Sequence, residues 1–388
     1  MFSPIHSMPS SLTVAFHAQA YRMKEQGQTV YDLTAGEAKV PTHPLLLEGL
    51  QKKLAEQPVY YASTVGIHSL REQATSWLNR SYSCSYEPSE CIVTAGGKFG
   101  LYLVFGTYLR PQAEVIIPAP YWVTYPSLVT YFGGQPVVVE TTEEQDFKLT
   151  PESLEAAITE QTQMLVLNNA GNPTGTLYTR DEMAALLDIA AAHDLLVVSD
   201  EVYSALVYEG SYTSCGSFPE YKKRVFVIQS CSKSFAMTGW RVGFLLGPEE
   251  LMPPLLRLQG QSLTSTATTS QWVAEIALTH ADTITTWVRE AMQERRDAFV
   301  SAFHDIFDAP FSPPSSALYA FVPLTALGFS SEAASDSMKA CQFLLEEAQV
   351  VAVPGIGFGS EGYVRCSFAG NPENNRNALQ RIQHLLAT

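Results

Sequence analysis

A lysine between two serines has the clearest chemical potential in this sequence. Lys233 lies in the segment QSCSKSFAMTGWRVGF directly after an apolar run, with Ser230 and Ser232 on either side and Arg241 eight positions later. A lysine amine forms a Schiff base with an aldehyde when its surroundings favour the neutral amine. The alternative is a solvated surface lysine, and the neighbouring hydroxyl and guanidinium groups favour the chemical interpretation.

Other polar residues also follow apolar runs. Asp200 follows LLVVS, Asn172 follows QMLVLNN in the turn GNPTG, the segment AGGKFG follows CIVT, and Arg365 lies within YVRCSFA. Each of these residues also has a purely structural interpretation. An acid at a strand end often caps a turn, and GNPTG and GG are common in loops. A lone arginine often forms a surface ion pair. Two glycines that open a helix also present backbone N–H groups to an anion.

The elements that must position these residues form a regular series. Between Glu90 and about Gly247, helical stretches alternate with the apolar runs CIVTA, EVIIPAP, QPVVVE, QMLVLNN, LLVVSD, RVFVIQS and RVGFLL. This alternation predicts an α/β fold with a mainly parallel seven-stranded sheet. Ligands bind beyond the carboxyl ends of such strands, where these polar residues fall. The sequence therefore predicts one shared cleft.

The length of 388 residues exceeds that of a usual compact domain. We expect an N-terminal arm with part of a small domain over residues 1–44, a large domain over 45–285, and a small α+β domain over 286–388. One continuous helix from about Ala267 to Phe303 should connect the two domains. The pair Pro313 and Pro314, short apolar runs, a helix around Ala334 to Glu347 and a final helix follow it in the small domain.

Composition excludes several classes of function. The net charge of -15 and the absence of a Lys/Arg cluster disfavour nucleic acid as a partner. The start MFSPIHSMPSS has no cationic segment followed by an apolar one, and no later apolar run could cross a bilayer, so we expect a cytoplasmic protein without membrane contact. Six dispersed cysteines without CxxC pairs predict reduced thiols rather than disulfides or a metal site.

The segment SCSKSFAMTGWRVGF closely resembles the cofactor-lysine region of class I aminotransferases of fold type I, which use pyridoxal 5'-phosphate (PLP). The resemblance extends in the family's order through YDLTAGEAKVPTHP, YYASTVGIHSLRE, VTAGGKFGLY, PAPYWVTYP, NNAGNPTGTLY, VVSDEVYSALVYEG, VAVPGIGFG and YVRCSFA. It implies a fold type I PLP-dependent transferase in which a large cofactor-binding domain is joined to a small one.

The resemblance gives the catalytic roles to Lys233, Asp200 and Tyr203. Lys233 would form the internal Schiff base and then move the substrate's α-proton. Asp200 would keep the ring nitrogen protonated, so that the ring can act as an electron sink. Tyr203 and Asn172 would bond the phenolic oxygen of the cofactor.

The same motifs imply the remaining cofactor and substrate residues. The further cofactor-binding set is Gly96, Gly97, Lys98, Trp122, Ser230, Ser232, Arg241 and, from the neighbouring subunit of a homodimer, Tyr61. The substrate-binding set is Gly36, Lys98, Trp122, Asn172 and Arg365. In this set Arg365 would hold the substrate α-carboxylate with two hydrogen bonds.

Within the family, the chain most resembles the bacterial aspartate aminotransferase branch, because Lys98 in GGK could meet a distal carboxylate. This implies ping-pong transamination between aspartate and 2-oxoglutarate. An aromatic or broad-range aminotransferase and a PLP-dependent C–S β-lyase stay open, since NNAGNPTG and EAKVPTHP depart from the usual motifs near the substrate. A cofactor-sensing regulator and a metabolite-binding protein without chemistry are the alternatives outside enzymology.

Overall fold

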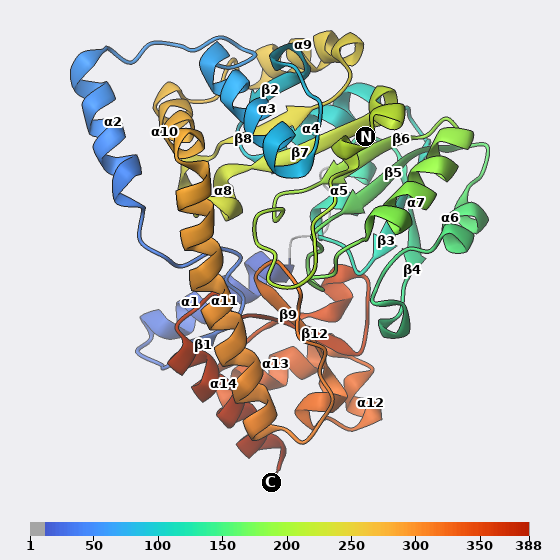
Figure 1. Cartoon of the computed structure of the whole chain (residues 1–388). Coiled ribbons are helices and arrows are strands. Elements are labelled where there is room, and N and C mark those ends of the chain that lie inside the picture. The colour runs from blue at the N-terminus through green and yellow to red at the C-terminus, as the bar shows by residue number, and fades with distance from the viewer. Residues whose placement is uncertain (1–11, 388) are drawn as a thin grey trace, which may run out of the picture.

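The computed structural model describes residues 12–387, and its centre is a seven-stranded sheet (Figure 1). The strand order is β2-β8-β7-β6-β5-β3-β4, and within the described residues β8 is the strand that runs antiparallel to its neighbours. The strands are β2 (Cys91–Thr94), β3 (Glu114–Ala119), β4 (Gln135–Glu140), β5 (Thr162–Asn168), β6 (Leu196–Asp200), β7 (Val225–Ser230) and β8 (Gly243–Leu246). The predicted mainly parallel seven-stranded sheet is confirmed.

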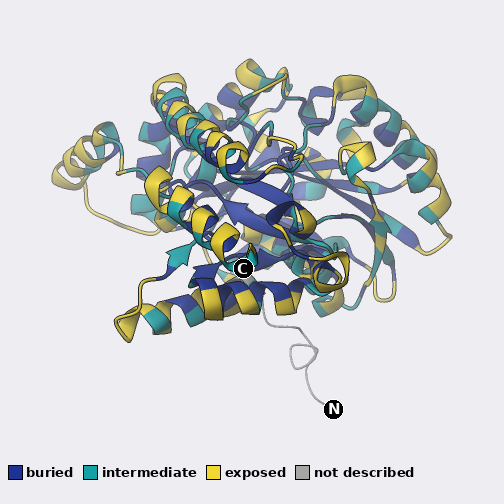
Figure 2. Ribbon diagram, turned by 90° about the horizontal axis from the view of Figure 1, so that it is seen from below, coloured by how far each residue is buried: buried dark blue, intermediate teal, exposed yellow. Residues whose placement is uncertain are grey.

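The sheet is covered on both faces, because successive apolar residues of its strands point to opposite sides. In β6, Val197 belongs to one hydrophobic core and Val198 to another. The first core is completed by α2 (Pro44–Glu56), α3 (His68–Tyr82), α7 (Arg180–Ala192) and α10 (Thr268–Thr279). The second is completed by α4 (Gly97–Tyr108), α5 (Thr124–Tyr131) and α9 (Met252–Ser262). The central strands are accordingly buried, and the helices expose their outer faces (Figure 2).

A smaller α+β unit lies beside the sheet. Its antiparallel sheet has the order β11-β12-β9, and a parallel pair joins β1 to β10. The strands are β1 (Tyr31–Asp32), β9 (Tyr319–Pro323), β10 (Val350–Val351), β11 (Val353–Pro354) and β12 (Tyr363–Ser367), and the helices are α1 (Leu12–Glu25), α12 (Ser331–Ala334), α13 (Ser337–Ala348) and α14 (Pro372–Leu386). Phe16 and Leu33 share a core with α13 and α14. The exact domain boundaries stay predictions.

The prediction of one helix from Ala267 to Phe303 was wrong. The chain forms α10 (Thr268–Thr279) and α11 (Ala281–Ile306), which are separated at His280. His280 has φ −113° and ψ 30°, outside the helical range, and Asp282 places an acid in the first turn of α11, where it favours a new helix start. Apolar spacing continues through this break, so the pattern alone did not reveal it.

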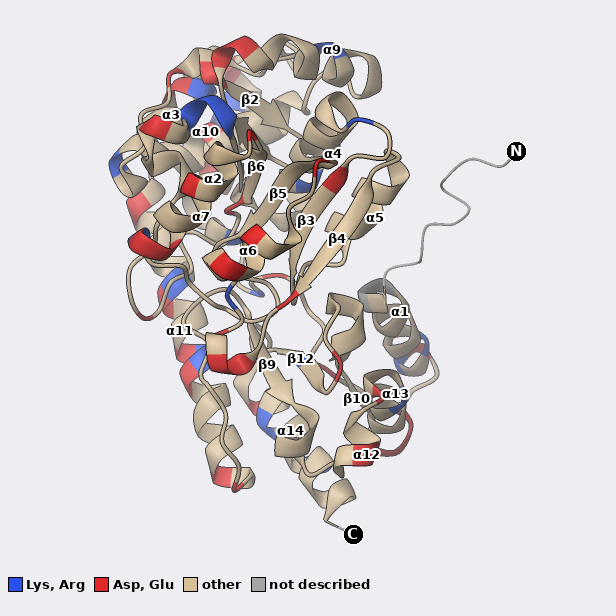
Figure 3. Ribbon diagram, turned by 90° about the vertical axis from the view of Figure 1, so that its right-hand side faces the viewer, with Lys and Arg blue, Asp and Glu red and all other residues tan. Residues whose placement is uncertain are grey.

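The surface and the cysteines agree with the composition. Over the face drawn in Figure 3, Lys and Arg segments are scattered among acidic ones. All six cysteines are free thiols. Among the described residues, no helix combines the length and apolar character that crossing a membrane requires.

Gly243 gives a test of the packing between β8 and the start of α4. A Cβ added there would lie 2.7 Å from the carbonyl carbon of Gly96 and 2.8 Å from the carbonyl oxygen of Gln229, both rigid backbone atoms. We expect Gly243→Ala to lower the free energy of unfolding by about 1–3 kcal/mol in urea titrations. Gly239→Ala is the control, because an added Cβ meets nothing within 4 Å there. Equal unfolding midpoints for the two variants would contradict this packing.

Candidate functional site

One cavity of about 420 Å³ brings most of the predicted residues together. It lies beyond the carboxyl ends of β5, β6 and β7 and is closed by β9 and β12 of the smaller unit. The predicted residues that line it are Gly36, Gly97, Lys98, Trp122, Asn172, Asp200, Tyr203, Ser230, Ser232, Lys233, Arg241 and Arg365. The expectation of one shared cleft at the strand ends agrees with this geometry.

Two of the predicted residues do not line the cavity. Gly96 lies just behind its wall, with φ 83°, and a Cβ there would stand 2.4 Å from Nη2 of Arg241. Glycine is therefore needed at position 96 so that the Arg241 guanidinium can lie against the chain. Tyr61 is 91% exposed, away from the cavity of its own chain.

Lys233 is held by a tight turn after β7. The short helix α8 (Cys231–Ser234) begins at once, and the Ser230 hydroxyl accepts a hydrogen bond from the Ser232 amide at 3.1 Å. Ser230 Oγ also donates to the carbonyl of Val242 at 3.1 Å. Lys233 Nζ donates to the carbonyl oxygen of Gly36, so the amine is directed into the cavity.

Asp200 ends β6 as a buried carboxyl group with 2% exposure. The Tyr125 hydroxyl donates to its Oδ2 at 2.8 Å, and the Val202 amide approaches Oδ1 at 3.4 Å. Burial raises the pKa of Asp200 to about 6, although these hydrogen bonds and the charge of Lys233 act in the opposite direction. Such a carboxyl group is suited to a cationic or protonated nitrogen that replaces the lost water.

The opposite end of the cavity is suited to an anion. The N-cap of α4 is Gly96, which has no side chain to cap the helix, so backbone N–H groups of the first turn face outward. The hydroxyls of Ser230 and Ser232 and the guanidinium of Arg241 lie beside this turn. The Arg241 side chain is fixed by donating to the carbonyls of Thr238 at 3.1 Å and Ala95 at 3.3 Å.

Arg365 is a buried cation with 2% exposure. Its Nη1 donates to Oδ1 of Asn172 at 3.1 Å and its Nη2 to the carbonyl of Thr34 at 3.2 Å, while Nε has no hydrogen-bond partner. No carboxylate within residues 12–387 forms a salt bridge with it. Buried charges are normally paired, so this guanidinium is suited to an anionic ligand.

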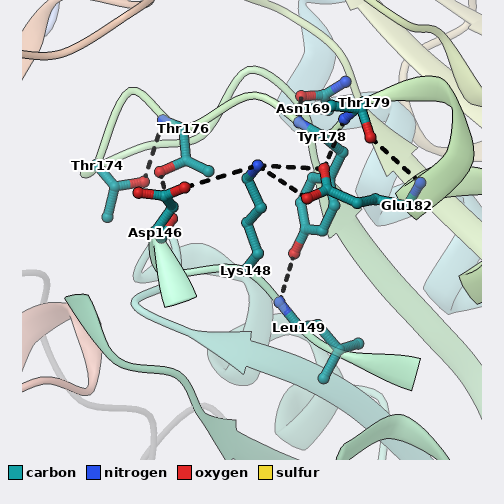
Figure 4. Close-up of polar contacts among 9 residues, drawn as sticks. All are labelled: Asp146, Lys148, Leu149, Asn169, Thr174, Thr176, Tyr178, Thr179 and Glu182. Carbon is teal, nitrogen blue, oxygen red and sulfur yellow. Dashed lines mark hydrogen bonds and ion pairs between the residues drawn. The ribbon is translucent and has the colours of Figure 1, made fainter. Parts of the chain in front are cut away.

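Polar contacts join the residues around the GNPTG turn to the segment after β4 (Figure 4). Lys148 forms a salt bridge with Glu182 at 3.1 Å, and the Tyr178 hydroxyl accepts from the Leu149 amide at 2.8 Å. These contacts tie the segment after β4 to Tyr178 and to the first turn of α7. Asn172 itself is held by its backbone amide, which donates to Oδ1 of Asn168 at 2.8 Å.

Lys98 lies at the second residue of α4, where its side chain reaches over Trp122. Its Nζ is 4.8 Å from the centroid of the indole ring, a cation–π contact. Partial burial and the charges of Arg241 and Lys233 lower the pKa of Lys98. Both predicted residues thus lie on one wall of the cavity, between the anion-binding turn and its opening.

Two tyrosines of the cavity were missed by the sequence analysis. Tyr125 donates to Asp200, and Tyr319 lies with its hydroxyl 2.9 Å from that of Tyr203. Tyr125 could have been found, because it lies in PYWVTYP, three residues after Trp122. Tyr319 follows the apolar pair Ala317 and Leu318 at the start of a strand, and that pattern gave no sign of a polar role.

Asp200 should make the ligand-free protein less stable as pH rises. Its folded pKa of about 6 exceeds the ordinary 3.8, so folding favours the protonated form, and stability is lost as pH rises from about 4 through 6. We expect Asp200→Asn to raise the free energy of unfolding by about 2–3 kcal/mol at pH 8 and to have no such effect near pH 4. Urea titrations at both values measure this, and a gain that is independent of pH would refute the assignment.

The chain matches known proteins over nearly its whole length. Residues 28–382 match the family described as aminotransferase class I and II. The aspartate/prephenate aminotransferase of Thermus thermophilus is 38% identical over 98% of this chain and 97% of the relative, and the aspartate aminotransferase of Bacillus subtilis is 34% identical over 98% of each. The solved structure of the Thermus thermophilus aspartate aminotransferase with maleate has a TM-score of 0.93 at 37% identity, covering 99% of this chain and 98% of that one. This chain belongs to the class I and II aminotransferases, which are PLP-dependent enzymes of fold type I.

Proposed function

We propose that this aminotransferase transfers the amino group between L-aspartate and 2-oxoglutarate by a ping-pong mechanism, with the cofactor attached covalently to Lys233. One observation carries the proposal. The buried guanidinium of Arg365, which no carboxylate of the described chain neutralises, faces the same cavity as the amine of Lys233 and the carboxyl group of Asp200. A molecule with an α-carboxylate can thus be held beside a reactive amine.

The cavity residues fit PLP in charge and in donor type. The uncapped first turn of α4, with Ser230, Ser232 and Arg241, would hold the phosphate. Asp200 would pair with the ring nitrogen, and Trp122 would lie on the ring face. Asn172 and Tyr203 would reach the phenolic oxygen. When bound, PLP supplies an electron sink for the negative charge that develops at the substrate Cα.

The remaining chemistry belongs to side chains of this chain. Arg365 and Asn172 bind the α-carboxylate and fix the orientation of the amino acid. Once the substrate's amino group has displaced it from the cofactor, Lys233 Nζ is a free amine that can take the proton from Cα. The Gly36 carbonyl, which accepts a hydrogen bond from that nitrogen, would limit where the amine can move. The aromatic rings of Trp122 and Tyr203 add apolar surface to the cavity that would receive the reacting atoms.

Lys98 supports the choice of aspartate. It lies on the cavity wall at a different place from Arg365, so that a substrate with two carboxylates could engage both cations. The Thermus thermophilus relative was solved with maleate, a dicarboxylate with the same four-carbon chain as aspartate. We therefore assign the distal carboxylate to Lys98.

Absorption spectroscopy of the purified enzyme tests the proposal. We expect the visible band of the bound cofactor to be lost when aspartate alone is added and to return with 2-oxoglutarate, because each half-reaction is complete without the other substrate. Lys98→Met should weaken the response to aspartate about 10- to 100-fold, since a charged hydrogen bond is lost, and should leave any response to phenylalanine unchanged.

Lys233→Ala is the matched control, and it should bind the cofactor without being converted by any amino acid. Conversion by phenylalanine but not aspartate would overturn the aspartate assignment and favour an aromatic aminotransferase. Release of a thiol and a 2-oxo acid from cystathionine, without a second substrate, would favour the C–S β-lyase. A wild-type protein that never develops the band would overturn the role of Lys233.

We also propose that the active unit is a homodimer to which Tyr61 contributes across the interface. Three consecutive apolar residues are exposed, Val59 by 51%, Tyr60 by 75% and Tyr61 by 91%. Nearby α2 exposes Leu47 and Leu54 by 51% and 49%. Contiguous exposed apolar side chains of this kind are typical of a protein interface.

Hybrid dimers test the contribution of Tyr61. Tyr61→Ala and Lys233→Ala chains, mixed during refolding, should form hybrids in which one of the two sites is intact. In an equal mixture about half of the dimers are hybrids, so at a cofactor concentration that fills intact sites but not Tyr61→Ala sites we expect about a quarter of the wild-type activity. Activity equal to the mean of the two separate variants would show that Tyr61 does not act across an interface.

A further inference from the structure

Tyr319, the first residue of β9, contacts two separate parts of the proposed machinery. It is 2% exposed and lines the cavity. Its hydroxyl oxygen lies 2.9 Å from that of Tyr203, the residue assigned to the cofactor's phenolic oxygen. Its ring lies 4.1 Å from Cζ of Arg365, a cation–π distance.

The same hydroxyl also lies against the backbone that holds Lys233. A Cβ added at Gly36 would be 3.1 Å from the Tyr319 oxygen, so glycine leaves room for this side chain. The carbonyl of Gly36 accepts the hydrogen bond from Lys233 Nζ. Tyr319 therefore fills the space between the cofactor side of the cavity and its carboxylate side.

The electrostatic setting distinguishes the two hydroxyls. Burial raises the pKa of Tyr319, but the charges of Lys233 and Arg365, with the hydrogen bond to Tyr203, outweigh this and leave it below its ordinary value. Burial and the neighbouring Tyr319 raise the pKa of Tyr203 well above its ordinary value. Tyr203 has a single hydroxyl proton, which the proposed function directs at the cofactor's phenolic oxygen, so the proton shared by the two tyrosine hydroxyls must come from Tyr319.

We propose that Tyr319 is a positioning residue with two separable parts, a hydroxyl that orients Tyr203 and a ring that supports Arg365. The hydroxyl donates to Tyr203, so that the Tyr203 proton is directed at the phenolic oxygen of the cofactor. Hydrogen bonds in such a chain strengthen one another. The inference rests on the proposed roles of Lys233, Tyr203 and Arg365 and adds a residue that links them.

The pH titration of the holoenzyme's visible band tests the hydroxyl. Tyr319→Phe keeps the ring and removes the donor, so Tyr203 stabilises the phenolic oxygen less, and the band should titrate about half a pH unit higher. In a Tyr203→Phe background, the same substitution should leave the midpoint unchanged. Tyr208→Phe is the control, because its hydroxyl donates to the carbonyl of Ala317, two residues before Tyr319, and should not shift the midpoint.

The binding of maleate, followed in the same spectra, tests the ring. Tyr319→Phe should alter the dissociation constant less than about twofold, whereas Tyr319→Leu should raise it about 3- to 20-fold through loss of the cation–π contact. An unchanged midpoint in Tyr319→Phe, or a shift that persists without the Tyr203 hydroxyl, would overturn the inference even if Tyr319→Leu fails to fold. A wild-type band that does not titrate would instead count against the proposed attachment at Lys233.

Discussion

Two buried groups of opposite charge, Arg365 and Asp200, are held apart in one cavity, and the rest of the structure serves to keep them there. Each has 2% exposure, and moving an ion out of water costs several kcal/mol. If they met, each would neutralise the other, and neither would bind a ligand. They are placed on different sheets, Asp200 at the end of β6 and Arg365 within β12, and each is fixed by neutral donors or acceptors rather than by a counter-charge. The free-energy cost of burying these two groups is offset by the extensive apolar cores on either side of the central sheet.

With the proposed roles of these residues, the substrate would bind between two parts of the chain. Arg365 belongs to the smaller unit, whereas Asn172 belongs to the turn after β5. Other contacts join the same two parts. The ring centroids of Phe147 and Phe321 are 5.7 Å apart, and the Tyr363 hydroxyl donates a hydrogen bond of 3.3 Å to Glu143. A carboxylate bound between Arg365 and Asn172, as proposed above, would add to contacts that already hold the two units together. Recognition of the α-carboxylate would then be coupled to the relative position of the units.

The parts of this site that could be predicted from the sequence are those carried by local motifs. Lys233, Ser230 and Arg241 lie within sixteen consecutive residues, and their relative position follows from one strand, one turn and one further strand. Asp200 and Asn172 could be placed because parallel strands bring their carboxyl ends to one edge. The position of Tyr319 in the site could not be predicted, because it arises from the packing of β9 against residues more than a hundred positions away in sequence. The break at His280 was missed for a related reason: the apolar period is the same in one long helix and in two successive ones.

Charge balance in the cavity links the cofactor to the choice of substrate. Its lining carries four cationic side chains, Lys98, Lys233, Arg241 and Arg365, and two carboxylates, Glu37 and Asp200. With a phosphate beside Arg241 and a carboxylate beside Arg365, as proposed above, Lys98 is left as a cation without an assigned anion. Burial, together with the positive charges of Arg241 and Lys233, lowers its pKa. A second carboxylate on the substrate relieves this repulsion, whereas an aromatic side chain would leave it and could gain only from the face of Trp122. The proposed preference for a dicarboxylic amino acid therefore has an electrostatic basis in the charges of the cavity lining.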